Sequence, residues 1–327
     1  MEAKLVTTRE ELRDVREKLW NARAFSVDVE TSGVNKFKDV LEGVSLSTDT
    51  HCWFISMAES GQGSEVTATD LHDALDTVFD DETKIVLGHN IVFDIHFLDR
   101  FCHLVPRGEM WDTMTMAHLL YEVKMNHLGL KTLAPIFTGI TLRDFKEGYL
   151  NKPLEEQAEY AMGDAIVTYK LAKELGRRLS ARKLLAYYRE HVAPLSRVVF
   201  QMEKFGWRLD RAAVLEDEMK LMMQLQSIQD DIRQNFEAWT GKEFVSTEWS
   251  SKKGPAEFNI NSSQQIGKVL THMGEKLPPT PGGGASSGAK VLEKLTRNPL
   301  AQAILRYRGV NKLMSTYIRS SKGDDEG

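Results

Sequence analysis

The stretch FSVDVE, residues 25–30, alternates small or apolar side chains with polar ones and is rich in valine. This pattern is typical of a β-strand. Side chains two positions apart on a strand point to the same face, so we expect the carboxylates of Asp28 and Glu30 to lie next to each other. The segment therefore predicts a strand that carries two adjacent acidic groups.

Two later clusters each place a carboxylate four residues after another polar side chain. In GHNIVFD, Asn90 and Asp94 are four residues apart, where the strand-like KIVLG gives way to FDIHFL. In YAMGD, Tyr160 and Asp164 are also four apart, within a segment of helical apolar spacing. Residues four apart on a helix share a face. Each cluster therefore delivers polar side chains to one point.

Four carboxylates that gather without a cationic partner repel one another, and a hard divalent cation with oxygen ligands is the usual remedy. We therefore predict a pair of Mg²⁺ or Mn²⁺ ions held by Asp28, Glu30, Asp94 and Asp164. Taken singly, each cluster has a plainer interpretation as solvated charge, a helix cap or a helix surface pair. Their order, their strand and helix contexts and their spacing favour one shared site.

These clusters resemble the three motifs of the DEDD exonucleases, in the tyrosine branch that forms the 3′→5′ proofreading domain of family A DNA polymerases. In order along the chain, the matching residues are Asp28 with Glu30, Asn90 with Phe93 and Asp94, and Tyr160 with Asp164. The stretches WDTMTMAHLL, GLKTLAPIF and DAIVTYKLA are also similar to that family. The resemblance covers roughly residues 20–180 and implies an α/β, ribonuclease-H-like fold with a mixed sheet.

The resemblance also implies roles for the motif residues. Asp28 is expected to bridge two metal ions and Asp94 to act mainly through the outer shell of the second ion. Glu30 and Asp164 are expected to complete the coordination of the first. Tyr160 is expected to orient the attacking water, because an unperturbed phenol is a poor base at neutral pH.

Contacts with the DNA strand are implied in the same way. A 3′ terminal nucleotide reaches a recessed site only when it is unpaired. Thr31 and Val34 match positions that contact the terminal nucleotide and wedge between bases, and valine is smaller than the leucine often found there. Asn90 is expected to contact the terminal sugar or phosphate, or to serve only as a local turn or cap residue.

The second half of the chain resembles the thumb of the same polymerases, in segments such as MEKFGWRLD, FNINSSQQIGKVL and ILRYRGVNKLMSTY. We expect an exonuclease domain at residues 1–182 and an all-α, thumb-like region at 183–327. The Gly/Pro/Ser-rich tip at 273–288 either lies against duplex phosphates or is a plain loop. Near the end of the chain, the residues that either touch phosphate or form ordinary helix surface are Lys312, Ser315 and Thr316.

Composition narrows the class of protein. The 327 residues are 42% apolar, which is ordinary for globular domains, and a net charge of −5 means that any DNA binding must be local. Two cysteines give no disulfide framework, and we find no signal peptide and no run of about eighteen apolar residues. We expect a cytoplasmic protein without a membrane partner.

Hydrophobic patterning predicts a helix at residues 8–22, with Thr8 and Glu11 at capping-box spacing. Strands are predicted at AFSVDV, EGVSLST, HCWFIS and KIVLG, and a helix near residues 70–80. Beyond residue 183 the pattern is almost wholly helical, with long segments at 185–205 and 210–240.

Three functions fit these observations. The first is a two-metal 3′→5′ exonuclease that forms the editing and thumb portion of a family A DNA polymerase, as a fragment or as a split-gene subunit whose palm and fingers lie on another chain. The second is a non-catalytic DNA-binding or assembly subunit. The third is an RNase-D-like RNA exonuclease, against which the thumb-like half argues. We expect no nucleotide incorporation by this chain alone.

Overall fold

The computed structural model describes residues 1–121, 128–143, 152–250, 254–280 and 282–319. The chain divides into two compact units, residues 1–206 and 207–327, and each is described by itself. The sequence analysis expected a boundary after residue 182. The difference arises from helix α8 (Ala193–Phe205), whose Phe200 is buried in the core of the first unit, with its ring centroid 4.9 Å from that of His96.

The first unit is built on a six-stranded mixed sheet with strand order β1-β4-β3-β2-β5-β6. The strands are β1 (Glu2–Val6), β2 (Ala24–Thr31), β3 (Leu41–Ser47), β4 (His51–Ser56), β5 (Ile85–Gly88) and β6 (Glu109–Asp112). Strand β3 runs antiparallel to β2 and β4, whereas β2, β5 and β6 are mutually parallel and β1 is parallel to β4. The predicted α/β fold with a mixed sheet is therefore confirmed. The four predicted strands are β2 to β5, and the short edge strands β1 and β6 were not predicted.

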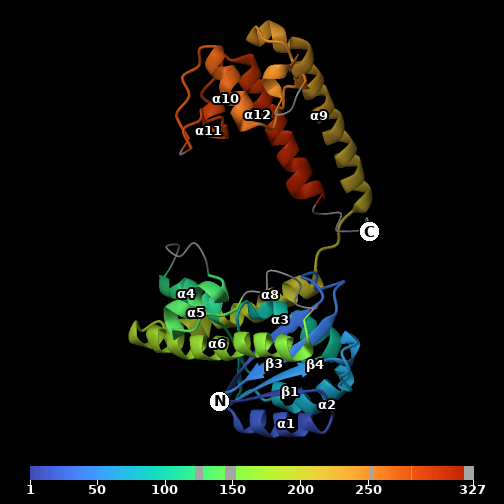
Figure 1. Ribbon diagram of the computed structural model, residues 1–327, viewed down its shortest axis with the longest axis vertical. Helices are drawn as coiled ribbons and strands as arrows, with labels where there is room; N and C mark the ends of the chain where they lie inside the picture. The colour runs from blue at the N-terminus through green and yellow to red at the C-terminus, as the bar shows by residue number, and fades with distance from the viewer. Residues whose placement is uncertain (122–127, 144–151, 251–253, 281, 320–327) are drawn as a thin grey trace. The chain divides into compact units, whose positions relative to one another are not determined.

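Helices cover both faces of this sheet (Figure 1). They are α1 (Glu11–Asn21), α2 (Ala68–Phe79), α3 (Ile91–Cys102), α4 (Thr113–Tyr121), α5 (Leu130–Thr138), α6 (Leu154–Ala181), α7 (Leu185–Tyr187) and α8, with a short 3₁₀ turn at Ala58–Ser60 and a π-helical turn at Tyr188–Val192. The amide and hydroxyl of Thr8 both donate to the Glu11 carboxylate, but the reciprocal bond of a capping box does not form, because the N-cap of α1 is Glu10 and has no side-chain capping bond.

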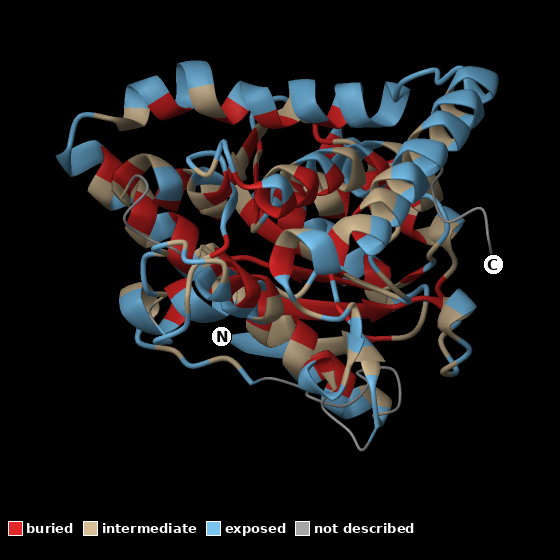
Figure 2. Cartoon of the chain, turned by 90° about the horizontal axis from the view of Figure 1, so that it is seen from above, coloured by how far each residue is buried: buried red, intermediate tan, exposed pale blue. Residues whose placement is uncertain are grey.

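Strand β2 separates an apolar core from the polar face that will carry the site. Its Phe25, Val27 and Val29 are buried in the cluster that α1, α2 and α3 complete. Because side chains alternate along a strand, Asp28 and Glu30 point the other way, toward α6. Figure 2 shows the buried residues concentrated in the strands and on the inward faces of the helices.

The second unit is mainly helical and has its own apolar core. It comprises α9 (Arg211–Thr240), β7 (Val245–Ser246), a 3₁₀ turn at Thr247–Trp249, β8 (Ala256–Glu257), α10 (Ser263–His272), α11 (Ala289–Leu292), α12 (Pro299–Lys312) and a π-helical turn at Leu313–Ile318. The expectation of an all-α region is corrected by the small antiparallel pair β7-β8. None of the described helices is both long enough and apolar enough to cross a bilayer.

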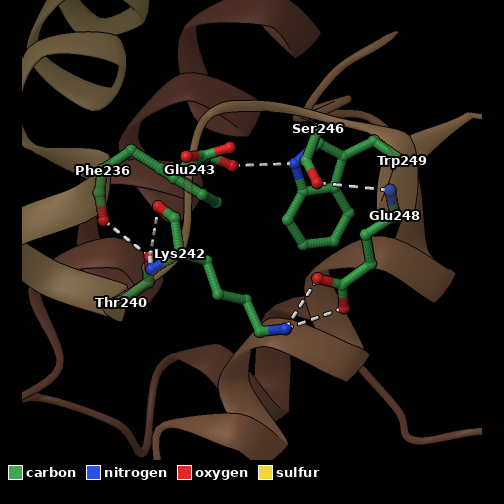
Figure 3. A network of polar contacts seen from close by, with 7 residues as sticks. All are labelled: Phe236, Thr240, Lys242, Glu243, Ser246, Glu248 and Trp249. Carbon is green, nitrogen blue, oxygen red and sulfur yellow. Dashed lines mark hydrogen bonds and ion pairs between the residues drawn. The ribbon is translucent and has the colours of Figure 1, made fainter. Parts of the chain in front are cut away.

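Polar contacts fix the turn that leaves α9 (Figure 3). The Thr240 hydroxyl donates to the carbonyl of Phe236 at 2.7 Å and accepts the backbone N–H of Lys242 at 3.1 Å. The Lys242 ammonium pairs with Glu248 at 2.7 Å, and the Trp249 indole donates to the carbonyl of Glu243 at 3.0 Å. These contacts hold the Trp249 ring inside the core of the second unit.

Candidate active site

Asp28 and Glu30 lie in the part of β2 that extends beyond its pairing with β5. β2 pairs with β5 only as far as Ser26, so the N–H of Val29 has no strand partner on that side. The Asp94 carboxylate accepts this N–H at 3.0 Å. Asp94 is 4% exposed and lies in the first turn of α3, so this bond fixes the start of α3 against the strand that carries Asp28.

Helix α6 brings the third motif to the same face of the sheet. The buried hydroxyl of Ser26 donates to the carbonyl of Ala165 at 2.7 Å, one residue beyond Asp164. Farther along, Ala158 and Ala161 of α6 pack on the ring of Phe54. Small residues at these positions allow α6 to approach the sheet closely, which places Asp164 next to β2.

A glycine in β3 makes room for this packing. Gly43 is the register partner of Glu30, and a Cβ atom there would lie 2.4 Å from the Phe54 ring. The backbone bulge between Glu30 and Thr31 occurs at the same point in the strand. The absence of a side chain at Gly43 therefore lets the Phe54 ring lie under α6, beside the acidic cluster.

The four carboxylates are close enough to affect each other's ionisation. Burial, and after it the charges of the other three acids, raise the pKa of Asp28 well above its ordinary value. Burial and the charges of Asp164 and Asp94 raise the pKa of Glu30 to about 8. Burial raises the pKa of Asp94 and raises that of Asp164 to about 6. The structure thus brings together the acidic residues predicted from three distant segments.

The donor set suits a divalent cation. One buried carboxylate oxygen, Oδ1 of Asp164, has no hydrogen-bond partner. Carboxylates with raised pKa values and an unsatisfied oxygen fit a hard cation that would neutralise them. In the described part of the chain, no group of three or more His, Cys, Asp or Glu side chains is already arranged to hold a metal ion.

Tyr160 lies one helical turn before Asp164 on α6, so the two side chains share a helix face. Burial and the neighbouring Asp164 charge raise the pKa of the Tyr160 phenol to about 12. A cation that the sequence analysis did not single out, Lys131 of α5, has its ammonium 5.4 Å from the centroid of the Tyr160 ring. Only the resemblance of GLKTLAPIF to the family pointed to this segment.

Asn90 directs the chain from β5 into α3. It is the N-cap residue of α3, its φ of 63° is in the left-handed region, and its side chain makes no capping hydrogen bond. Its backbone N–H donates to the Asp112 carboxylate at 2.9 Å, and Asp112 also accepts from the N–H of Met114 at 2.8 Å. Asp112, which the sequence analysis did not predict, therefore sets the entry into α3 and leaves the Asn90 amide available for other contacts.

A cavity of about 590 Å³ adjoins the second motif. Its lining includes Val34, Phe37, Asn90 and Phe93, together with side chains of α8. The Val34 side chain is 86% exposed. Thr31, just before the loop, donates its hydroxyl to the carbonyl of Gly33 at 2.6 Å. Of the two residues predicted to touch the terminal nucleotide, Val34 lines this cavity, and Thr31 directly follows Glu30 in the chain.

The DNA contacts predicted for the second half of the chain belong to the second unit. Lys312 ends α12, Ser315 and Thr316 follow it in the π-helical turn, and all three are exposed. The described residues of the 273–288 segment contain no helix, and a bridge between Pro279 and Ala285 narrows the loop. Residue 281 lies outside the described residues.

Curated relatives resemble most of this chain. The DNA polymerase I of Chloroflexus aurantiacus is 30% identical over 94% of this chain, and that of Borreliella burgdorferi is 26% identical over 95%. The matched regions are only 32% and 33% of those polymerases, so the chain spans about a third of the length of these relatives.

Solved structures agree in fold. The POL domain of Pol1 from M. smegmatis, in complex with DNA primer-template and dNTP, has a TM-score of 0.69 at 17% identity, covering 96% of this chain and 49% of its own. Brucella melitensis NrnC with bound Mg²⁺ has a TM-score of 0.51 at 21% identity, covering 63% of this chain and 96% of its own.

Family profiles divide the chain as its sequence motifs do. The profile of the DNA polymerase family A matches residues 223–322, within the second unit. The profile described as 3′-5′ exonuclease matches residues 3–180, which carry all three acidic motifs. The chain therefore belongs to the 3′-5′ exonuclease family found with family A DNA polymerases, and it is a nucleic-acid hydrolase.

Proposed function

We propose that this exonuclease removes nucleotides one at a time from unpaired 3′ ends of DNA, with two divalent ions, Mg²⁺ or Mn²⁺, as cofactors. The observation that carries the proposal is the convergence of four carboxylates, two buried (Asp94 and Asp164) and two half-buried (Asp28 and Glu30), in which burial and the neighbouring acids raise the pKa of Asp28 and Glu30. Such a cluster disfavours the metal-free folded state, and bound cations would relieve that cost.

The residues proposed to hold the ions are Asp28, Glu30, Asp94 and Asp164. Bound divalent ions would lower the pKa of the attacking water and stabilise the departing 3′ oxygen. Since no ready-made ligand group stands among the described residues, the proposal includes rotamer changes that close the carboxylates around the ions. The Asp94 carboxylate would move least toward the ions, because one of its oxygens already accepts the N–H of Val29.

The chain's own contribution to hydrolysis is to orient the reacting groups. The oxygen of water attacks the terminal phosphorus, the bond from phosphorus to the 3′ oxygen breaks, and a nucleoside 5′-monophosphate leaves. With a pKa of about 12, Tyr160 stays protonated at neutral pH and cannot serve as the base. We assign it the task of orienting the water by hydrogen bonding.

Substrate binding is assigned to the cavity beside the second motif. The apolar side chains of Val34 and Phe93 would contact unstacked bases, which favours single-stranded ends. Thr31 and Asn90 would contact the terminal nucleotide, and the Asn90 amide is suited to this because it does not cap α3. A paired 3′ end would have to unpair before it could enter.

The wider context follows from the relatives. We propose that the protein acts in DNA replication as the editing and thumb portion of a family A DNA polymerase, with palm and fingers supplied by the same or a partner chain. In the second unit, the residues proposed to bind duplex phosphates are Lys312, Ser315, Thr316 and the segment 273–288.

A nuclease assay tests this function. Purified chain is incubated with a 5′-labelled DNA primer carrying a 3′ mismatch, with Mg²⁺ or with EDTA, beside a matched primer and an RNA of the same sequence. We expect a ladder of single-nucleotide steps that needs metal, is fastest on the mismatched DNA and is lost in Asp28→Ala but kept in Glu17→Gln, an exposed control on α1. Faster cleavage of RNA, or equal cleavage by Asp28→Ala, would overturn the proposal.

A further inference from the structure

Ser45 lies in strand β3, on the face of the sheet that carries the acidic cluster. Its register partner on β2 is Asp28, and its register partner on β4 is Phe54. Residues directly opposite each other on neighbouring antiparallel strands point to the same face, with Cβ atoms about 4.5–5.5 Å apart. The Phe54 ring packs against Ala158 and Ala161 of α6, so this row of side chains faces that helix.

The hydroxyl of Ser45 is buried and has no hydrogen-bond partner. The side chain is 0% exposed, and its Oγ atom forms no hydrogen bond. Two other buried serines on this face do have partners, since Ser26 donates to the carbonyl of Ala165 at 2.7 Å and Ser47 donates to that of Thr48 at 3.2 Å. A buried hydroxyl without a partner costs free energy, so its presence in a folded protein calls for an explanation.

The cross-strand neighbours of Ser45 indicate which group its hydroxyl can serve. Phe54 presents an aromatic ring, whereas Asp28 presents a carboxylate, which accepts hydrogen bonds at about four lone-pair positions. Metal coordination uses only some of these positions. A serine side chain moves its oxygen between three staggered positions by rotation about χ1 alone. The Ser45 hydroxyl can therefore turn toward Asp28 without any change in the backbone.

We propose that Ser45 is a positioning residue, which donates a hydrogen bond to the Asp28 carboxylate when divalent ions bind and so fixes the orientation of this ligand. The inference rests on the proposed function, in which Asp28 holds the ions. Carboxylates that ligate a metal are in turn hydrogen-bonded by neighbouring groups, which orient them and strengthen metal binding. The same hydroxyl is left without a partner in the metal-free fold.

This role predicts opposite effects of Ser45→Ala on stability and on metal affinity. Alanine fits the same space and removes an unpaired polar group, so the thermal midpoint in EDTA should rise by about 1–4 °C. Loss of the donor should weaken Mn²⁺ binding about 10-fold, since hydrogen bonds to metal ligands typically change metal affinity by about 10- to 100-fold. A serine that served only packing would leave the Mn²⁺ affinity unchanged.

Two measurements on the purified chain test the inference. Isothermal titration calorimetry with Mn²⁺ gives the affinity, and thermal unfolding in EDTA gives the stability. Ser47→Ala is the matched control, because Ser47 is equally buried on the same face of β3 but opposes Ser26 instead of an acid. This variant loses hydrogen bonds to the carbonyls of Thr48 and His51, so its midpoint should fall, while its Mn²⁺ affinity should stay within about twofold of wild type.

Activity gives a further readout. In cleavage of a labelled single-stranded oligonucleotide, the Mn²⁺ concentration for half-maximal rate should rise about 10-fold in Ser45→Ala and stay at the wild-type value in Ser47→Ala. Wild-type Mn²⁺ affinity in Ser45→Ala would overturn the proposal. A midpoint of Ser45→Ala below that of wild type in EDTA would also overturn it, because the hydroxyl would then have a partner in the metal-free fold.

The wild-type titration separates the two proposals. If wild type binds no Mn²⁺ and shows no metal-dependent cleavage, the proposed function fails. If wild type binds Mn²⁺ and cleaves DNA, but Ser45→Ala binds the ion equally well, only the role of Ser45 fails.

Discussion

Replacing Glu30 by glutamine should stabilise the metal-free protein while abolishing its activity. Burial and two neighbouring carboxylates raise the pKa of Glu30 from 4.5 to about 8. The folded state thus binds this proton more tightly than the unfolded state. The resulting contribution to stability is complete below pH 4.5 and is lost as the pH rises through about 8.

The size of the effect follows from the same two pKa values. At pH 8, ionising Glu30 costs the folded state at most about 5 kcal/mol relative to the unfolded chain. Glutamine removes the charge but still buries a polar amide, so we expect a gain of about 2 to 3 kcal/mol. For a unit of this size that gain corresponds to a rise of about 5–10 °C in thermal midpoint.

The measurement is thermal unfolding of wild type and Glu30→Gln in EDTA at pH 8 and pH 5. At pH 5 the two should differ by less than about 1 kcal/mol, because wild-type Glu30 is then protonated in the folded state. Glu17→Gln, exposed on α1, should match wild type at both pH values. A midpoint for Glu30→Gln at or below that of wild type at pH 8 would refute the mutual repulsion.

Three further outcomes follow from the site. Mg²⁺ or Mn²⁺ should raise the thermal midpoint of wild type more at pH 8 than at pH 5.5, since only deprotonated carboxylates ligate, and an equal rise at both pH values would exclude a carboxylate site. Ser26→Ala should cost about 1 kcal/mol in urea unfolding and lower kcat, because the hydrogen bond that fixes α6 is lost; unchanged kcat would contradict this. Gly43→Val should lower the free energy of unfolding by more than about 2 kcal/mol, because its side chain would clash with the Phe54 ring. The urea midpoint should fall accordingly, and an unchanged midpoint would disprove the clash.

The strands that alternate clearly could be predicted from the sequence, and those at the sheet edges could not. The segment of β2 alternates over its whole length, with Phe25 and Val27 on one face and Ser26 and Asp28 on the other. Strand β6 has only four residues, EMWD, and its identity as a strand depends on pairing with β5. A pairing that spans more than twenty residues leaves no local pattern in so short a segment.

The acidic residues could be predicted because their spacing reports local geometry, two along a strand and four along a helix. Lys131 and Asp112 act through contacts with residues more than twenty positions away, and no such interval marks them. The domain boundary was placed before α8 for a similar reason. The apolar pattern of α8 shows a helix, but not that Phe200 packs beside α3.

The main chain holds the site together, whereas its charges oppose one another. The contacts that fix α3 and α6 against β2 use backbone groups, the N–H of Val29 and the carbonyl of Ala165. Neither contact depends on pairing the carboxylates with a cation, so the elements can keep their places while the acidic side chains repel. Binding of a divalent ion would remove this repulsion. The free energy that the repulsion costs the metal-free fold would then add to the affinity for the ion. We therefore expect such a site to bind cations strongly, because backbone contacts hold its elements in place while a buried oxygen, Oδ1 of Asp164, lacks a hydrogen-bond partner.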